Sequence, residues 1–261
     1  MDLELRDKVV LITGGAKGIG AAIVRAVLHE GGNPVIVDRD LDAGNKLVAQ
    51  LRSGGRRCGF AHADLTSAES CSRVVEGVLN EWTSLDALVN NAGVNDRVSL
   101  ERGSPDEYVG SLQCNLFHYF NMAHYALPHL KRSKGAILNI ASKTAVTGQG
   151  GTSGYASAKG AILALTREWA VELLEYGIRV NAIVPAEVMT PLYQQWLSSF
   201  PNPEAKLKNI VARIPLEKRM TTPEEIAATA VFLLSSKAAG HITGQHLFVD
   251  GGYVHLDRAL S

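Results

Sequence analysis

Short apolar runs rich in β-branched residues alternate along the chain with segments whose apolar positions recur at helical spacing. The first run, residues 8–13, is KVVLIT, and it predicts a buried strand because it is short and is followed by glycines. Residues 18–30 then carry Ile19, Ile23 and Val27 at a spacing that predicts a helix, and a Gly-Gly pair follows where a helix would end. The chain therefore opens with a strand followed by a helix.

The same alternation continues to the end of the sequence. Further strands are expected at 34–37, 58–61, 85–89, 136–140, 179–184 and 246–249, and helices at 42–51, 68–82, 104–130, 154–176 and 223–234. Strands that alternate with helices pair in parallel, with helices on both faces of the sheet. The sequence thus predicts an α/β, doubly wound domain, whose ligands bind at the carboxyl ends of the strands.

The stretch between 189 and 220 is too long for an ordinary connection. It contains Pro191, Pro201, Pro203 and Pro215, and its apolar pattern is less regular than elsewhere. We interpret it as a partly helical lid over a substrate. No linker divides the sequence, so residues 1–261 are expected to form a single domain.

Composition narrows the classes of partner. Lys and Arg together number 26, and so do Asp and Glu together. This balance of charge argues against nucleic acid or an acidic membrane surface as a binding partner. No apolar run is long enough to span a membrane, and the first residues lack a secretory pattern. Cys58, Cys71 and Cys114 show no metal-binding spacing, which predicts free thiols, no bound metal and a cytoplasmic location.

A glycine-rich turn lies between the first strand and the first helix. Its sequence, TGGAKGIG at 13–20, allows backbone N–H groups to approach a pyrophosphate, which the helix N-terminus also attracts. Such turns also occur simply as links, but the place in the first strand–helix unit favours a dinucleotide. The residues expected to contact it are Gly14, Lys17, Gly18, Ile19 and Gly20.

Asp38 ends the second expected strand, about 20 residues after the glycine-rich turn. A carboxylate there accepts hydrogen bonds from ribose hydroxyls and repels a 2′-phosphate, so it favours NAD over NADP. Lys17 and Arg39 are basic residues of the kind that serve NADP, and an aspartate here could also be a turn or helix cap. We expect the carboxylate to outweigh exposed cations nearby.

Two further groups follow the third and fourth strands at the same edge. They are Asp64 with its neighbour Leu65, and the segment Asn90-Asn91-Ala92-Gly93. Asp64, Leu65, Asn91, Ala92 and Gly93 are interpreted as cofactor contacts, although either group could serve a turn alone.

Tyr155 and Lys159 are four residues apart on an expected helix and therefore face the same way. A nearby ammonium favours the phenolate of a tyrosine, which would suit proton transfer. Ser142, after the fifth strand, is positioned to hydrogen-bond a reacting oxygen. Asn115 lies within an expected helix, although asparagine is a poor helix former. It could hold a water in a proton relay. Each residue has an ordinary structural explanation, but their joint placement points to catalysis.

Together these motifs, with Pro185–Thr190, resemble the pattern of the short-chain dehydrogenase/reductase family over essentially the whole chain. The resemblance implies a Rossmann-type domain with a seven-stranded sheet, usually in a homotetramer. It implies Tyr155 as acid/base, Lys159 holding the nicotinamide ribose and lowering the tyrosine pKa, Ser142 orienting the substrate, and Asn115 supporting a water. The nicotinamide end would be held by Pro185, Val188 and Thr190. The family usually has glycine after this proline, where the chain has Ala186.

More loosely, residues 143–193 resemble L-fucose dehydrogenases and related aldose 1-dehydrogenases. A sugar needs several directed hydrogen bonds, whereas a steroid or acyl chain needs an apolar slot. The substrate residues expected beside Ser142 and Tyr155 are Lys143, Gln149, Glu187 and Trp196, with Tyr193 as a second stacking ring. Lys143 could instead be a solvated loop charge, and Trp196 could simply pack the lid.

The preferred hypothesis is NAD-dependent oxidation of C1 of L-fucose or a related aldose. Other alcohols or ketones stay open: a 3-oxoacyl thioester, which would favour NADPH, or a steroid or polyol. A non-catalytic NAD-binding protein would be expected to lose Tyr155 or Lys159, and both are present.

Overall fold

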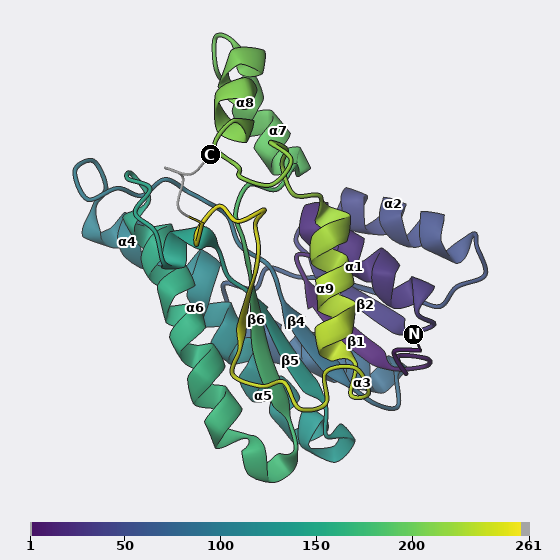
Figure 1. The fold of residues 1–261 in the computed structure, drawn as a ribbon. Coiled ribbons are helices and arrows are strands. Elements are labelled where there is room, and N and C mark those ends of the chain that lie inside the picture. The colour runs from purple at the N-terminus through teal and green to yellow at the C-terminus, as the bar shows by residue number, and fades with distance from the viewer. Residues whose placement is uncertain (1, 257–261) are drawn as a thin grey trace.

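The structure, a computed structural model, describes residues 2–256, and its sheet confirms the expected fold class. Seven parallel strands lie in the order β3-β2-β1-β4-β5-β6-β7 (Figure 1). Their bounds are β1 Val9–Thr13, β2 Asn33–Asp38, β3 Gly59–His62, β4 Ala87–Asn90, β5 Ala136–Ile140, β6 Arg179–Pro185 and β7 His246–Val249. The strand order reverses between β1 and β4, which places the ligand crevice at their carboxyl ends. The ends of the domain expected at 1–261 lie outside the described residues.

Helices cover both faces of the sheet (Figure 1). A separate hydrophobic core lies between the sheet and the helices on each face. Side chains of β1 alternate between the cores: Val9 and Leu11 belong to one, Val10 and Ile12 to the other, as the two-residue strand period requires. One face carries α1 Gly18–His29, α2 Leu41–Arg52 and α9 Pro223–Leu234. The other carries α3 Ala68–Glu81, α4 Pro105–Leu112, α5 His118–Ser133 and α6 Ser153–Glu172.

The single helix expected at 104–130 is interrupted. A capping box between Ser104 and Glu107 starts α4, close to the expected beginning of the helix, but residues Gln113–Phe117 form a π-helical turn before α5 begins. A π turn accommodates one extra residue, which shifts the helix phase by about 100°. As a result α4 packs against α6, whereas α5 packs against α3 and the sheet.

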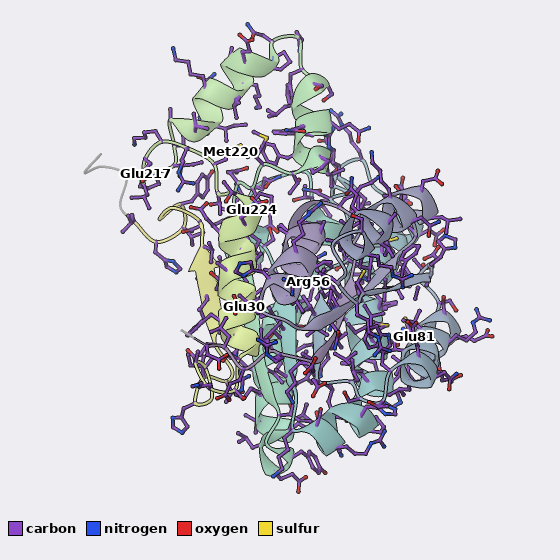
Figure 2. The ribbon with its side chains drawn as sticks, turned by 90° about the vertical axis from the view of Figure 1, so that its right-hand side faces the viewer. Glu30, Arg56, Glu81, Glu217, Met220 and Glu224 are labelled. Atoms are coloured by element: carbon purple, nitrogen blue, oxygen red, sulfur yellow. The ribbon has the colours of Figure 1, made fainter. Side chains whose placement is uncertain are left out.

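Residues between β6 and α9 form two short helices, α7 Pro191–Ser198 and α8 Pro203–Val211. Figure 2 shows these helices projecting beyond the sheet, with Met220 near their base. The two ends of the segment are held together by a bridge between Val188 and Thr221, in which Met189 N–H donates to the Thr221 carbonyl at 3.2 Å. The expected partly helical character is therefore present.

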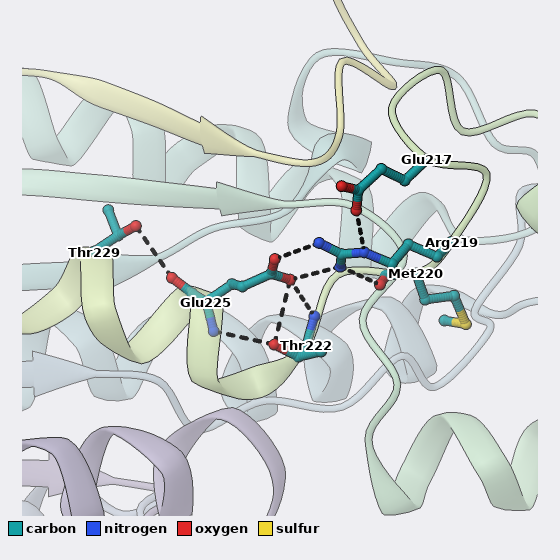
Figure 3. A network of polar contacts seen from close by, with 6 residues as sticks. All are labelled: Glu217, Arg219, Met220, Thr222, Glu225 and Thr229. Carbon is teal, nitrogen blue, oxygen red and sulfur yellow. Dashed lines mark hydrogen bonds and ion pairs between the residues drawn. The ribbon is translucent and has the colours of Figure 1, made fainter.

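An ion-pair network closes the base of this segment (Figure 3). Arg219 donates to both carboxylate oxygens of Glu225, at 3.0 and 2.7 Å, and to Glu217 at 2.6 Å. Glu225 also completes a capping box with Thr222 at the start of α9, and Arg219 keeps the pKa of this carboxyl low, at about 2. The α7–α8 segment therefore begins at the bridge between Val188 and Thr221 and ends at the ion-paired N-terminus of α9.

The three cysteines are free, as expected. Within residues 2–256 no group of three or more His, Cys, Asp or Glu side chains is arranged to hold a metal ion. No helix in the same range is both long and apolar enough to cross a membrane.

Candidate active site

A cavity of about 1640 Å³ opens at the carboxyl ends of the strands and extends beneath α7 and α8. It is lined by every residue expected to contact cofactor or substrate except Gly20. Of the four expected catalytic residues, Ser142, Tyr155 and Lys159 line it, and Asn115 lies behind the wall. The structure therefore brings the dispersed sequence motifs to one place.

The glycine-rich turn forms a close-fitting cradle. Gly14 has a φ of +62°, and a Cβ there would lie 2.9 Å from the Ala92 Cα. At Gly20 a Cβ would lie 2.1 Å from the Gly14 carbonyl oxygen, so this glycine permits the turn to form but does not face the cavity. Asn91 fastens the turn to the end of β4, because its side-chain amide donates to the carbonyls of Thr13 and Gly14 at 2.9 and 3.1 Å.

The N-terminus of α1 faces the cavity without a side-chain cap. Unsatisfied N–H groups and the helix dipole make such an end an anion site, which fits the pyrophosphate of a dinucleotide. Lys17 lies beside it, but its ammonium is ion-paired with Asp40. Lys17 is therefore already partly neutralised before any ligand binds.

Asp38 and Asp64 also line the cavity. The Asp38 carboxylate accepts hydrogen bonds from the N–H groups of Ala16 and Asp40, both at 3.0 Å, which fix it at the end of β2. Asp64 accepts from the N–H and hydroxyl of Thr66, and these bonds lower the pKa of its carboxyl. Both side chains line the cavity and offer oxygen acceptors, which suits the hydroxyl groups of a nucleoside.

Ser142 follows β5, and Tyr155 and Lys159 lie one turn apart on α6. Burial raises the pKa of Tyr155, a hydrogen bond from the Ser142 side chain lowers it, and the charge of Asp96 raises it. The Lys159 ammonium lies 5.6 Å from the centre of the Tyr155 ring, and burial is the largest influence on the pKa of this tyrosine. The lowering of this pKa by Lys159, which the family resemblance implied, stays a prediction.

Lys159 is only 3% exposed, and burial lowers its pKa to about 7. Its ammonium donates to the Ile140 carbonyl at 2.8 Å and to the Tyr119 hydroxyl at 3.0 Å. Asn115, in the π turn, uses its side chain to accept from the Val94 N–H at 2.7 Å and to donate to the Ser111 carbonyl. The Asn115 side chain thus braces the loop after β4.

A polar wall lies on the other side of Ser142. Lys143 and Glu187 form an ion pair whose side chains are each 11% exposed. The second oxygen of Glu187 accepts from the Tyr193 hydroxyl at 2.6 Å, and burial together with this carboxylate raises the pKa of the phenol. Trp196 meets Tyr193 edge-on, with ring centres 5.0 Å apart. Of the expected substrate residues, Gln149 alone is exposed, at the rim.

Two tyrosines in or behind this wall were not expected from the sequence. Tyr253 comes from the end of the described chain, and the Lys143 ammonium lies 4.2 Å from the centre of its ring. Tyr119 is fully buried on α5. The only sequence signal for Tyr119 is its spacing of four from Asn115, and for Tyr253 its place directly after the Asp-Gly-Gly turn.

Known proteins resemble the chain over nearly its whole length. A family model described as enoyl-(acyl carrier protein) reductase matches residues 14–254. The L-fucose dehydrogenase of Oryctolagus cuniculus is 38% identical over 246 residues, covering 94% of this chain and 84% of that protein.

The chain belongs to the short-chain dehydrogenase/reductase family.

It is therefore an oxidoreductase of a family whose dehydrogenases use nicotinamide cofactors. Among solved structures, one titled Cj0485 dehydrogenase matches with a TM-score of 0.94 and 50% identity, covering 100% of this chain and 99% of that one. The ligand-free aldohexose dehydrogenase of Thermoplasma acidophilum matches with a TM-score of 0.88 and 30% identity, covering 99% and 98%.

The departure of this short-chain dehydrogenase/reductase from the usual glycine after Pro185 causes no strain. Among the described residues, Ala186 is not one of those with positive φ, so alanine fits the backbone as it stands.

Proposed function

We propose that this short-chain dehydrogenase/reductase oxidises the C1 hydroxyl of L-fucose, or of a closely related aldose, to the lactone with NAD. The observation that carries the proposal is the polar wall beside Ser142 and Tyr155, where Lys143, Glu187 and Tyr193 offer fixed donors and acceptors to several hydroxyl groups. Trp196 gives the same cavity a ring for the apolar face of a sugar. The likeness to L-fucose and aldohexose dehydrogenases supports the same substrate class.

In this proposal the chain's own residues handle the proton. The chemistry that NAD supplies when bound is acceptance of a hydride at its nicotinamide ring. The Tyr155 oxygen removes the C1 hydroxyl proton, and Ser142, which shares a hydrogen bond with Tyr155, holds the same substrate oxygen as it becomes a carbonyl. The Lys159 side-chain nitrogen lies 5.6 Å from the centre of the Tyr155 ring. The C1–H bond breaks with its electron pair, so atoms and charge balance as lactone, NADH and a proton.

The proposed cofactor is held along the cradle. Gly14, Gly18 and Ile19 would receive the pyrophosphate at the α1 N-terminus, while Asp38 and Asp64 would face the adenosine. Ala92 and Gly93 would lie along the cofactor's path, with Pro185, Val188 and Thr190 at the nicotinamide end.

A panel of sugars and alcohols tests the proposal, with NADH absorbance as the readout. L-fucose or another aldose should give the highest kcat/KM, well above that of cyclopentanol, a steroid alcohol or a 3-hydroxyacyl thioester. Preference for one of these less polar substrates would contradict the sugar assignment.

Asp38→Ser is expected to reduce the preference for NAD. The fixed carboxylate repels a 2′-phosphate, so its removal should raise kcat/KM with NADP about 10- to 100-fold, which corresponds to about 1.4–2.8 kcal/mol. Asp42→Ser, an aspartate on the first turn of α2 that does not line the cavity, serves as the control. Wild-type kinetics with NADP equal to or better than with NAD would contradict the assignment of NAD.

We propose that residues 189–220 close over the bound ligands. The bridge between Val188 and Thr221 and the ion pairs of Arg219 hold the two ends of this segment, so α7 and α8 can move as a unit. Amide hydrogen exchange in α7 and α8 should slow when NAD and sugar are added together, with α3 unchanged as an internal reference. Equal protection with and without ligands would count against closure.

We also propose a homotetramer, the assembly that the family resemblance implies. Phe117, Phe120, Val171 and Leu174 are exposed apolar side chains in α5 and α6 or directly next to them. Light scattering at micromolar concentration should give four times the mass of the chain, and a monomer alone would contradict this.

A further inference from the structure

The catalytic lysine has a buried partner that neither the sequence motifs nor the family pattern assigns. Tyr119 is fully buried, and its hydroxyl donates to the Ile140 carbonyl at 2.9 Å. The same hydroxyl accepts from the Lys159 ammonium at 3.0 Å, and Lys159 itself reaches the Ile140 carbonyl at 2.8 Å. The ammonium, the phenol and the carbonyl therefore form a closed triangle of hydrogen bonds.

We propose that Tyr119 is a positioning residue for the reaction, holding the Lys159 ammonium in the place and charge state in which it serves Tyr155. This inference rests on the proposed roles of Tyr155 and Lys159. It adds a fifth side chain, Tyr119, to the expected group of Asn115, Ser142, Tyr155 and Lys159.

Burial makes the choice of tyrosine informative. A buried hydroxyl is costly unless both its donor and its acceptor capacity are used, and here Ile140 and Lys159 use them. Phenylalanine would fill the same space without that cost. The hydroxyl therefore has a local function, and among residues 2–256 its only hydrogen-bond partners are the Lys159 ammonium and the Ile140 carbonyl.

The π turn places Tyr119 where it can act. Asn115 and Tyr119 are four residues apart, the first within the turn and the second just after it. A Cβ built on Gly93 would lie 3.0 Å from the Asn115 side-chain oxygen and 3.6 Å from the Lys159 ammonium nitrogen, so these two groups converge on the same loop. The interrupted helix thus brings two successive side chains of its inner face to the surroundings of the lysine.

The titratable side chains that face Lys159 are mostly neutral. Tyr155 faces it from its own helix, and Tyr119 and His118 face it from α5. His118 is neutral at physiological pH, because burial and the charge of Lys159 lower its pKa to about 4. No carboxylate pairs with Lys159 among residues 2–256, although Asp96 acts on Tyr155. The Tyr119 oxygen is consequently one of two neutral acceptors that favour the charged ammonium.

Tyr119→Phe removes that acceptor and keeps the ring. We expect kcat with the best sugar to fall about 10- to 100-fold, the range for losing a hydrogen bond to a charged group. Tyr125→Phe is the matched control, since Tyr125 lies on the same helix and its hydroxyl has no hydrogen bond among the described residues. The control should retain wild-type kinetics.

A titration of the cofactor-free protein separates positioning from simple structural support. With lysine labelled at Cε, the Lys159 resonance, assigned with Lys159→Arg, should titrate near pH 7 in the wild type and about one pH unit lower in Tyr119→Phe. If Tyr119→Phe does not fold, site-specific 3-fluorotyrosine at 119 weakens the acceptor without changing shape, and should shift the titration in the same direction by less.

An unchanged Lys159 titration in Tyr119→Phe would overturn the proposal for Tyr119, even if kcat falls. Failure of the proposed function has a different signature: Tyr155→Phe would then retain turnover, whatever Tyr119→Phe does. The titration needs neither substrate nor cofactor, so it decides the role of Tyr119 in either case.

Discussion

Tyr155→Phe is expected to lower kcat for sugar oxidation by about 10²–10⁴-fold, the usual contribution of a general base. The substitution deletes the proton acceptor and keeps the ring that lines the cavity. NAD affinity, measured by fluorescence titration, should change little because the cradle around Gly14 is untouched. Tyr108→Phe is the control. The Tyr108 hydroxyl donates a hydrogen bond to Ser157 on α6, the helix that carries Tyr155, but Tyr108 does not line the cavity.

The same residue sets the expected pH dependence. Burial raises the pKa of Tyr155, so in the chain alone the phenolate is the minor form at neutral pH. Oxidation requires that basic form, and its rate should therefore rise as pH rises and fall as pH falls. A rate that declines between pH 7 and 9, or a Tyr155→Phe enzyme with wild-type turnover, would contradict Tyr155 as the base.

Glu187→Ala should have the second largest effect, on both stability and sugar turnover. It leaves the Lys143 ammonium buried without its carboxylate, a change that costs about 3–5 kcal/mol and lowers Tm by about 10 °C. It also frees the Tyr193 hydroxyl and removes a fixed acceptor, so kcat/KM for the sugar should fall at least about 100-fold. Glu69→Ala, which breaks an exposed ion pair on α3, should change neither.

A double variant separates the two effects. Lys143→Met with Glu187→Leu replaces the buried pair by apolar side chains of similar size, which should restore most of the stability. Sugar turnover should stay low, while turnover of a small apolar alcohol should be kept or improved. Recovery of sugar turnover together with stability would show that the polar wall supports the fold and does not recognise the substrate.

Much of the fold follows from local patterns. The strand Ala136–Ile140 and the helix Pro223–Leu234 have the bounds expected from the sequence, because a continuous apolar run and a Pro-Glu-Glu start are strong local signals. The π turn was not foreseeable, since one extra residue in a long helix leaves the apolar spacing on either side almost unchanged. The segment of α7 and α8 was expected to be partly helical, but the bounds of the two helices could not be predicted, because prolines interrupt their short patterns.

The convergence of some site residues could also be predicted from the sequence, whereas particular contacts within the candidate site could not. Gly14, Asp38 and Tyr155 each follow a strand or share a helix face with a partner, so their convergence could be derived from topology. The pairing of Lys143 with Glu187 could not, because the two residues are 44 positions apart and lie after different strands. The contact of Tyr119 with Lys159 was equally hidden, because it depends on the helix phase set by the π turn.

Oxidation of L-fucose carrying deuterium at C1 tests the central claim most directly. The proposal predicts that NAD is converted to deuterated NADH, one mass unit heavier than unlabelled NADH, with a lactone as the product. A primary isotope effect on kcat/KM is expected where hydride transfer limits the rate. Formation of unlabelled NADH from this substrate, or no NADH from L-fucose or any related aldose, would contradict the account.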